Sequence, residues 1–264
     1  MAEPKRSERG GTRFYELDGG RRYPSVTSIL QVIGKPALIQ WAAKEERNLV
    51  TQTAADLYAD LQKCKPMSRA AYVATLESRI GKECANVKLL AKAGEIGTQV
   101  HNMIEWNLRR ALGQKVGPEP RISGKASWAF MAFQDWCGGR KFKALLIEQI
   151  VFSDVHKYAG TMDLLAEIDG SPALIDFKTG KAVYREAHLQ NVAYQVALAE
   201  MGHTVPSCGI IVRLPKNETD PEFETVVVPS IAELFPRFLA AKTLWEWWYE
   251  GEREYQERRE AAAS

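Results

Sequence analysis

The spacing of hydrophobic residues changes once along the chain, near residue 140. From Pro36 to about Leu112, apolar residues recur at the three-to-four-residue spacing of amphipathic helices, and Pro36 suits a first helical turn. Residues 113–124 contain prolines and glycines that indicate a loop, and residues 125–136 are helical again. The chain up to this point is therefore predicted to be mainly helical.

Beyond this point the pattern is that of β-strands. Five apolar, partly β-branched runs follow, at 144–152, 158–168, 173–178, 208–214 and 223–228. One helix, over about 185–201, separates the third run from the fourth. Ser230 and Glu233 form a capping box that opens a last helix, which runs to about 259. This order predicts an α/β fold in which helices flank a central mixed β-sheet.

These elements divide a single domain into four segments. Residues 1–13 are polar and charged, and we expect a disordered tail there. An N-terminal hairpin and helical region is expected over 14–113. The core sheet with its helix is expected over 114–229, and the C-terminal helix over 230–264.

Membrane, secreted and metal-cluster proteins are disfavoured by composition. No run approaches the roughly 18 apolar residues of a membrane span, and the start of the chain is too polar for a secretory signal. We therefore expect an intracellular protein. The cysteines are far apart, without a CxxC pair, so we expect reduced, mostly buried thiols rather than zinc or iron–sulfur ligands: Cys64, Cys84, Cys137 and Cys208.

Charge adds little by itself. The chain has 35 basic and 33 acidic residues, a net charge of +2, but residues 246–260 hold six Glu and three Arg. The rest of the chain is thus modestly positive, which is compatible with a nucleic-acid partner. A solvated acidic helix end beside an ordinary body explains the same numbers equally well.

A hairpin over 158–181 carries the most informative residues. If the turn is Asp169-Gly170 alone, Asp163 lies opposite Asp176; if the turn extends to Pro172, Asp163 lies opposite Lys178. Either register places Asp163, Asp176 and Lys178 on one face of a half-buried sheet. Adjacent carboxylates repel unless a cation lies between them, and oxygen ligands on a rigid sheet suit Mg²⁺ or Mn²⁺. The alternative is a surface hairpin with a salt bridge.

Two helices flank this hairpin with further polar pairs. His101 and Glu105, four residues apart, share a helix face with Thr98. A single helical His is more often an ordinary packed side chain than a metal ligand. Gln190 and Tyr194 are also four apart, which the polar surface of an amphipathic helix would equally explain.

Taken in order, these residues resemble a known family. Gly97-Thr98, His101, Glu105, Glu148, Gly160 to Asp163, Asp176-Phe177-Lys178, Gln190 and Tyr194 resemble the RecB-like branch of the PD-(D/E)xK nucleases. Tyr23 to Leu30 is similar to the segment that opens small mitochondrial and phage exonucleases of this branch. The resemblance spans about 23–200, and Met162 stands where the family name has proline.

The resemblance implies a restriction-endonuclease-like fold and a DNA exonuclease that depends on Mg²⁺ or Mn²⁺. It implies His101, Asp163, Asp176 and the Phe177 carbonyl as metal ligands, with Glu148 as an outer acid. Lys178 would orient or deprotonate the attacking water, and Gln190 and Tyr194 would position the strand or brace Lys178. Contacts to nucleic acid are expected from Thr98, Glu105, Ser25, Thr27, Thr179, Lys181 and Arg185.

Tryptophans outside these motifs have two interpretations. Trp41, Trp128 and Trp136 could stack on unpaired bases, although core packing is the more common role. Aromatic residues lie on three sides of the last helix and cannot all face one core: Trp245, Trp247, Trp248 and Tyr249. We therefore expect a protein partner or an oligomer contact there.

The function predicted from these features is digestion of single-stranded or end-bearing DNA during recombination, repair or degradation. The start of the chain favours a cytoplasmic protein of bacteria or phage-infected cells, although a mitochondrial role fits the motifs equally. Alternatives are an endonuclease, a CRISPR-adaptation nuclease or a catalytically silent nucleic-acid-binding scaffold. A two-carboxylate glycoside hydrolase is disfavoured because it gives Lys178 no role.

Overall fold

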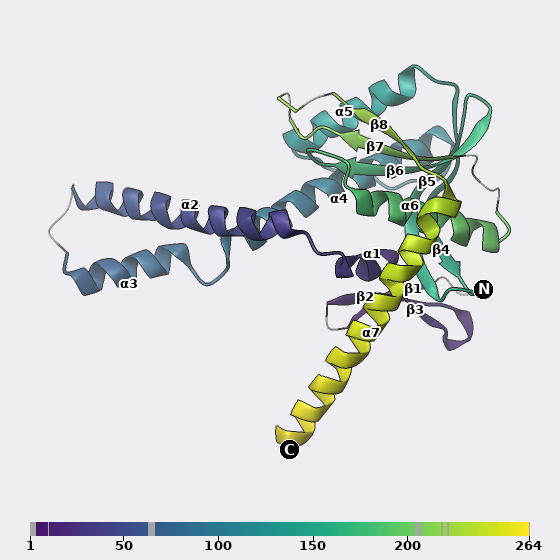
Figure 1. Ribbon diagram of the computed structural model, residues 1–264. Helices are drawn as coiled ribbons and strands as arrows, with labels where there is room; N and C mark the ends of the chain where they lie inside the picture. Colours follow the sequence, from purple (N-terminus) through teal and green to yellow (C-terminus); the bar gives the residue numbers. More distant parts are fainter. Residues whose placement is uncertain are drawn as a thin grey trace. The chain divides into compact units, whose positions relative to one another are not determined.

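The computed structural model describes residues 4–9, 11–62, 67–203, 206, 208–217, 219–220 and 222–263. The chain divides into two compact units, one of residues 34–96 and one of residues 1–33 together with 97–264 (Figure 1). This division differs from the segments expected from the sequence. Residues 14–33 belong with the sheet because the hairpin packs there: Ser25 forms a parallel bridge with Ala159.

The unit of residues 34–96 is helical. It contains α2 (Pro36–Leu61), α3 (Arg69–Ile80) and the first turns of α4 (Ala85–Ala111), which continues into the other unit. Arg79 forms an ion pair with Asp60 that joins α3 to α2. Glu46 accepts the main-chain N–H of Ala85 at 2.8 Å and so caps the start of α4. Cys64 and Pro66 lie outside the described residues.

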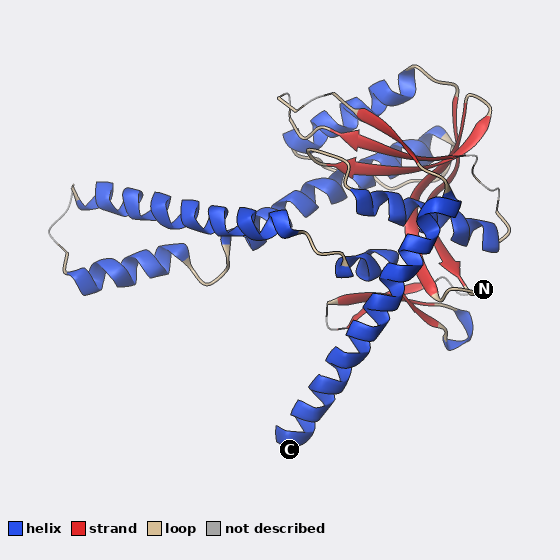
Figure 2. Ribbon diagram, in the orientation of Figure 1, coloured by secondary structure: helices blue, strands red, loops and turns tan. Residues whose placement is uncertain are grey.

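The other unit is built on a five-stranded mixed sheet (Figure 2). Its strands lie in chain order: β4 (Phe142–Ser153), β5 (Tyr158–Ile168), β6 (Ser171–Thr179), β7 (Cys208–Leu214) and β8 (Glu224–Val228). All neighbours are antiparallel except β6 and β7, which run parallel because α6 (Arg185–Glu200) connects them. The predicted mixed sheet flanked by helices is confirmed.

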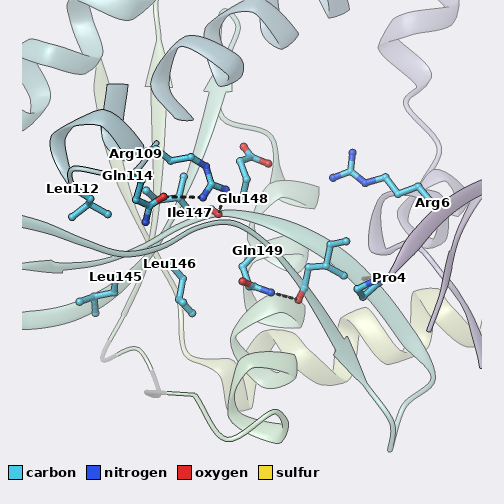
Figure 3. Close-up of a pocket in the computed structure, with 11 residues that line it drawn as sticks. Pro4, Arg6, Arg109, Leu112, Gln114, Leu145, Leu146, Ile147, Glu148 and Gln149 are labelled. Carbon is cyan, nitrogen blue, oxygen red and sulfur yellow. Dashed lines mark hydrogen bonds between the residues drawn. The ribbon is translucent and has the colours of Figure 1, made fainter. Parts of the chain in front are cut away.

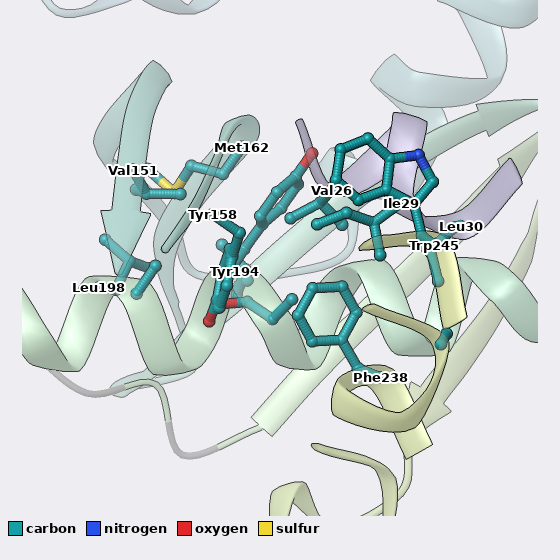
Figure 4. Packing of buried hydrophobic residues seen from close by; sticks show 14 of the residues in the cluster. Val26, Ile29, Leu30, Val151, Tyr158, Met162, Tyr194, Leu198, Phe238 and Trp245 are labelled. Atoms are coloured by element: carbon teal, nitrogen blue, oxygen red, sulfur yellow. The ribbon is translucent and has the colours of Figure 1, made fainter. Parts of the chain in front are cut away.

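Helices cover both faces of the sheet. The Phe177 ring meets Phe133 and Trp136 of α5 (Gly124–Gly138) edge-on. Trp136 is fully buried and donates to Thr225, so it is a core residue and not a platform for bases. On the α6 side, Tyr158 donates to the Ala193 carbonyl within a large apolar cluster (Figure 4). The sheet is therefore covered on both sides and not half-buried.

The N-terminal residues form a small sheet of β1 (Lys5–Arg9), β2 (Thr12–Glu16) and β3 (Arg22–Pro24), followed by α1 (Val26–Ile29). The sequence predicted a disordered tail over 1–13, whereas residues 5–9 pair along β2. Main-chain pairing needs no apolar side chains, and Arg6 adds a hydrogen bond to Thr161 of β5. A polar composition therefore did not prevent this strand.

The last helix, α7 (Ile231–Ala263), packs through only part of its length. Phe238, Ala241 and Trp245 are buried in the cluster that also holds α1 and α6 residues. Trp247 and Trp248 remain 71% and 58% exposed. Among the described residues, no helix has the length and apolarity to cross a membrane.

The described cysteines are free thiols, as expected, but they are not mostly buried. Cys84 is exposed, and Cys137 and Cys208 are partly buried. Burial raises the pKa of the Cys137 thiol to about 12, so this side chain stays protonated at neutral pH.

Candidate metal centre

The hairpin of β5 and β6 has the shorter of the two turns that its sequence allowed. Leu164 pairs with Ile175 and Ile168 with Ser171, so Asp169 and Gly170 alone form the turn, both with positive φ. The paired residues end at Leu164 and Ile175, and β6 continues beside β7. Asp163 and Phe177 thus lie just beyond the point where the two strands stop pairing.

The main chain of Phe177 makes two side-chain contacts at this opening. Its N–H donates to Oδ2 of Asp163 at 2.7 Å, and its carbonyl oxygen lies 3.1 Å from Nε2 of His101. A carbonyl oxygen, a carboxylate and an imidazole therefore meet at the end of the ladder. Three of the four groups that the family resemblance implies as metal ligands thus lie together here, and Asp176 is the fourth.

Glu148 of β4 completes a group of three side chains. His101 Nδ1 lies 3.5 Å from Asp163 Oδ1 and 3.6 Å from Glu148 Oε1. One ligand atom from each of His101, Glu148 and Asp163 lies within 4.8 Å of the others. The sequence assigned Glu148 an outer position and Asp176 an inner one, whereas the structure brings Glu148 into the trio.

Two carboxylates, those of Asp163 and Glu148, surround the His101 imidazole. Burial lowers the pKa of His101, but Asp163 and Glu148 outweigh that effect and raise it to about 9. Burial raises the pKa of Asp163, although His101 and Lys178 oppose the change. The protonated imidazole therefore supplies positive charge between the two carboxylates. Imidazole nitrogen and carboxylate oxygens are also ligands that divalent metals accept.

A second chain of contacts runs from Asp176 to α6. Lys178 Nζ donates to Asp176 Oδ1 at 2.7 Å and to Gln190 Oε1 at 3.1 Å, and Gln190 Nε2 donates to the Tyr194 hydroxyl at 3.1 Å. Oδ2 of Asp176 is buried and has no hydrogen-bond partner among the described residues. Burial raises the pKa of Asp176 to about 6 against the opposing charge of Lys178. An unpartnered buried carboxylate oxygen is a position that a cation would satisfy.

Gly160 of β5 makes room for this chain. A Cβ atom at Gly160 would lie 2.3 Å from Cε1 and 2.8 Å from the hydroxyl oxygen of Tyr194. Only glycine lets the Tyr194 ring rest against the strand. The glycine two residues before Met162 in the motif therefore has a packing reason.

The residues expected to contact nucleic acid fall into three groups. Thr98, Thr27, Lys181 and Arg185 are exposed, and Thr179 is partly buried beside Gly97. Ser25 is 2% exposed, and its hydroxyl caps α1 by accepting the N–H of Ser28, so it has a structural role that the sequence analysis did not anticipate. Glu105 forms an ion pair with Arg109 at 2.8 Å.

Sequence reasoning missed the surroundings of Glu148. A pocket of about 680 Å³ adjoins it, with Arg6, Arg109, Leu112 and Gln149 among its lining residues (Figure 3). The four-residue spacing of Glu105 and Arg109 on one helix was a readable sign of their ion pair. The long-range contact from Arg109 to β4 left no local pattern.

Comparison with known proteins places the chain in a family. Two solved structures of the alkaline exonuclease LHK-Exo from Laribacter hongkongensis are similar to it, and the second is a complex with dAMP. The TM-scores are 0.38 and 0.35 and the identities 14% and 13%; both cover 61% of this chain, and 84% and 85% of theirs. No curated protein sequence matches significantly. Residues 53–261 match the PD-(D/E)XK nuclease superfamily, and the chain belongs to that superfamily of nucleases.

Proposed function

We propose that the protein is an exonuclease of the RecB-like branch that hydrolyses DNA with Mg²⁺ or Mn²⁺, on single strands or at free ends. Nucleases of the superfamily use divalent metals. The observation that carries the proposal is the meeting of His101, Glu148 and Asp163 within 4.8 Å of one another, beside the Phe177 carbonyl. The unpartnered oxygen of Asp176 gives the same donor set a further carboxylate.

A divalent ion held there would supply Lewis-acid activation of a phosphodiester and of a water molecule. His101, Asp163 and the Phe177 carbonyl would hold it, with Asp176 and Glu148 contributing carboxylate oxygens. Hard oxygen ligands favour Mg²⁺ or Mn²⁺, and one imidazole nitrogen is compatible with Mn²⁺.

Lys178 is suited to act as a cationic donor. Burial lowers the pKa of its ammonium group, but Asp176 and Asp163 outweigh that effect, and the pKa lies above its ordinary value. The ammonium group keeps its proton at neutral pH and can offset negative charge that develops on the phosphate. Gln190 fixes the direction of Lys178, and Tyr194 holds Gln190 in turn. We therefore favour orientation of water and phosphate by Lys178 over proton abstraction.

Two exposed cations beyond the end of β6 would contact the DNA backbone. Lys181 lies just after β6, and Arg185 is the first residue of α6. Both are exposed. Thr98 and Thr27 are exposed hydroxyl donors. Such contacts to phosphate position a strand without reading its sequence, which suits a nuclease that digests from an end.

The test is digestion of oligonucleotides labelled at one end, single- and double-stranded, beside a circular single strand. We expect a ladder from one end with Mg²⁺ or Mn²⁺, none with EDTA, and an intact circle. Lys178→Met should reduce the rate at least ~100-fold, while Lys82→Ala, an exposed lysine of the helical unit, should not change it. Cleavage of the circle would indicate an endonuclease. Binding without any cleavage would indicate a scaffold and overturn the proposal.

We also infer that α7 contacts a second copy of the chain. Leu244, Trp247, Trp248 and Tyr255 are 57–71% exposed and share one helix face with Gly251. An antiparallel pair of α7 helices would bury these exposed side chains against the same residues of the second copy. A monodisperse monomer mass at high concentration would contradict this inference.

A further inference from the structure

One guanidinium group, that of Arg109, connects three parts of the chain near Glu148. Its Nε donates to Glu105 at 2.8 Å. Its two terminal nitrogens donate to Gln114 at 3.2 Å and to the main-chain oxygen of Ile147 at 3.1 Å (Figure 3). Glu105 lies one turn earlier on α4, and Gln114 follows the end of that helix. Arg109 thus ties the end of α4 to β4, one residue before Glu148.

Glu148 has a backbone conformation that residues with a Cβ rarely adopt. Its φ is +47°, in the left-handed region, although it lies inside a strand. Ile147 pairs with Leu164, and Gln149 pairs with Met162, so the strand keeps its register on both sides. The positive φ is confined to Glu148 within this strand. Such a conformation persists only where the surrounding structure holds it.

The hydrogen bond from Arg109 acts on the peptide group that leads into this residue. The carbonyl of Ile147 belongs to the peptide plane whose rotation sets φ of Glu148. Fixing that plane directs the Glu148 side chain, whose Oε1 lies 3.6 Å from His101 Nδ1. Without the guanidinium, the Ile147 carbonyl would lose the hydrogen bond that holds it on the side of Arg109.

We infer that Arg109 is a positioning residue: by holding the Ile147 carbonyl it keeps Glu148 left-handed and sets its carboxylate beside His101 and Asp163. The inference rests on the proposed function in taking this trio as a metal site. Glu105 then serves to anchor Arg109 rather than to contact DNA. It accepts from Nε and leaves the two terminal nitrogens to reach β4 and Gln114.

The ion pair between Arg109 and Glu105 would not by itself set the position of Glu148. The Arg109 and Glu105 side chains are 35% and 33% exposed, and an i,i+4 pair of this kind contributes little by itself. Lysine cannot replace arginine here, because an ammonium group lacks the planar fork that serves acceptors in three directions. Arg109→Lys therefore keeps the charge and removes the geometry.

The experiment measures Mn²⁺ affinity by calorimetry for four chains: wild type, Arg109→Lys, Glu148→Gln and the double variant. We expect Arg109→Lys to weaken Mn²⁺ binding ~10-fold, as loss of an outer partner does at other metal sites. It should weaken binding no further in the Glu148→Gln background, because coupled residues are not additive. Arg110→Lys is the matched control, since Arg110 lies over the Trp106 ring of its own helix.

Each outcome decides the inference. Wild-type affinity in Arg109→Lys, or an equal loss with and without Glu148, would overturn it while leaving the metal site intact. Absence of Mn²⁺ binding in the wild type would overturn the metal site and this inference with it. No effect of Glu148→Gln would overturn this inference alone. If melting without metal shows that Arg109→Lys does not fold, Glu105→Gln should give a smaller loss that again disappears in the Glu148→Gln background.

Discussion

Asp163 accepts the main-chain N–H of Phe177 through Oδ2 at 2.7 Å, at the end of the ladder between β5 and β6. The contact has two consequences. It satisfies an N–H group that has lost its strand partner, and it leaves Oδ1 of Asp163 facing His101. A structural hydrogen bond and a proposed metal-ligand position are thus combined in one carboxylate.

Removing the Lys178 charge should affect stability as well as activity. Lys178→Met leaves Asp176, whose side chain is 3% exposed, with neither oxygen paired. We expect the free energy of unfolding without metal to fall by ~1–3 kcal/mol. Asp176→Asn added to Lys178→Met should recover part of this loss without recovering activity. Urea unfolding in EDTA measures the effect, and an unchanged stability of Lys178→Met would show that Asp176 is satisfied by other means.

Without metal, stability should decrease as pH rises. The folded pKa of Asp176 is about 6 against an ordinary 3.8, and that of His101 is about 9 against 6.5. In both windows the folded state binds more protons than the unfolded state, so the free energy of unfolding falls from pH 3.8 to 6 and from 6.5 to 9.

His101→Gln tests the decrease in stability between pH 6.5 and 9 separately. The variant should show a flatter dependence between pH 6.5 and 9 in urea unfolding with EDTA, because it lacks the group that titrates there. A wild-type stability that rises over this window would mean that His101 does not bind its proton more tightly in the folded state.

Gly160 should not tolerate a side chain. The Cβ of Gly160→Ala would lie 2.3 Å from the Tyr194 ring, and displacement of that ring should cost ~1–3 kcal/mol. It should also disturb Gln190 and slow cleavage. Gly138→Ala is the control, because a Cβ there meets no atom within 4 Å. If the steric account is right, Gly160→Ala destabilises the Tyr194→Ala background much less than it does the wild type, which thermal melting can measure.

Substitutions at Glu148 should reverse the usual order of stability between alanine and glycine variants. Inside a strand, glycine is normally the less stable of the two. At φ +47° alanine keeps the left-handed strain and glycine does not, so Glu148→Gly should be more stable than Glu148→Ala by ~1 kcal/mol. Both should lose metal affinity. Equal stabilities, or a more stable alanine variant, would mean that β4 relaxes at this residue.

Much of this site follows from local sequence patterns. Period-two alternation placed Asp163, Asp176 and Lys178 on one face, and Asp169-Gly170 is a strong signal for the two-residue turn that forms. Helical spacing likewise paired Gln190 with Tyr194, which bond directly. These are short-range rules, and they hold wherever regular structure is maintained.

What the sequence did not predict depends on irregular or long-range structure. A left-handed glutamate has no sequence signature, so the place of Glu148 beside His101 required the fold. Ser25 matched a family segment, yet its hydroxyl is enclosed as a helix cap. The strand over residues 5–9 depends on pairing with β2, which its polar composition does not reveal.

Calorimetric titration of Mn²⁺ into wild type and Asp163→Asn tests the central claim most directly. The Asp163 side chain contacts both His101 and the Phe177 main chain. The account predicts saturable binding in the wild type, with proton release as His101 loses its proton. It predicts at least ~100-fold weaker binding and no DNA cleavage in Asp163→Asn. Equal affinity in the two chains would contradict a metal centre at this position.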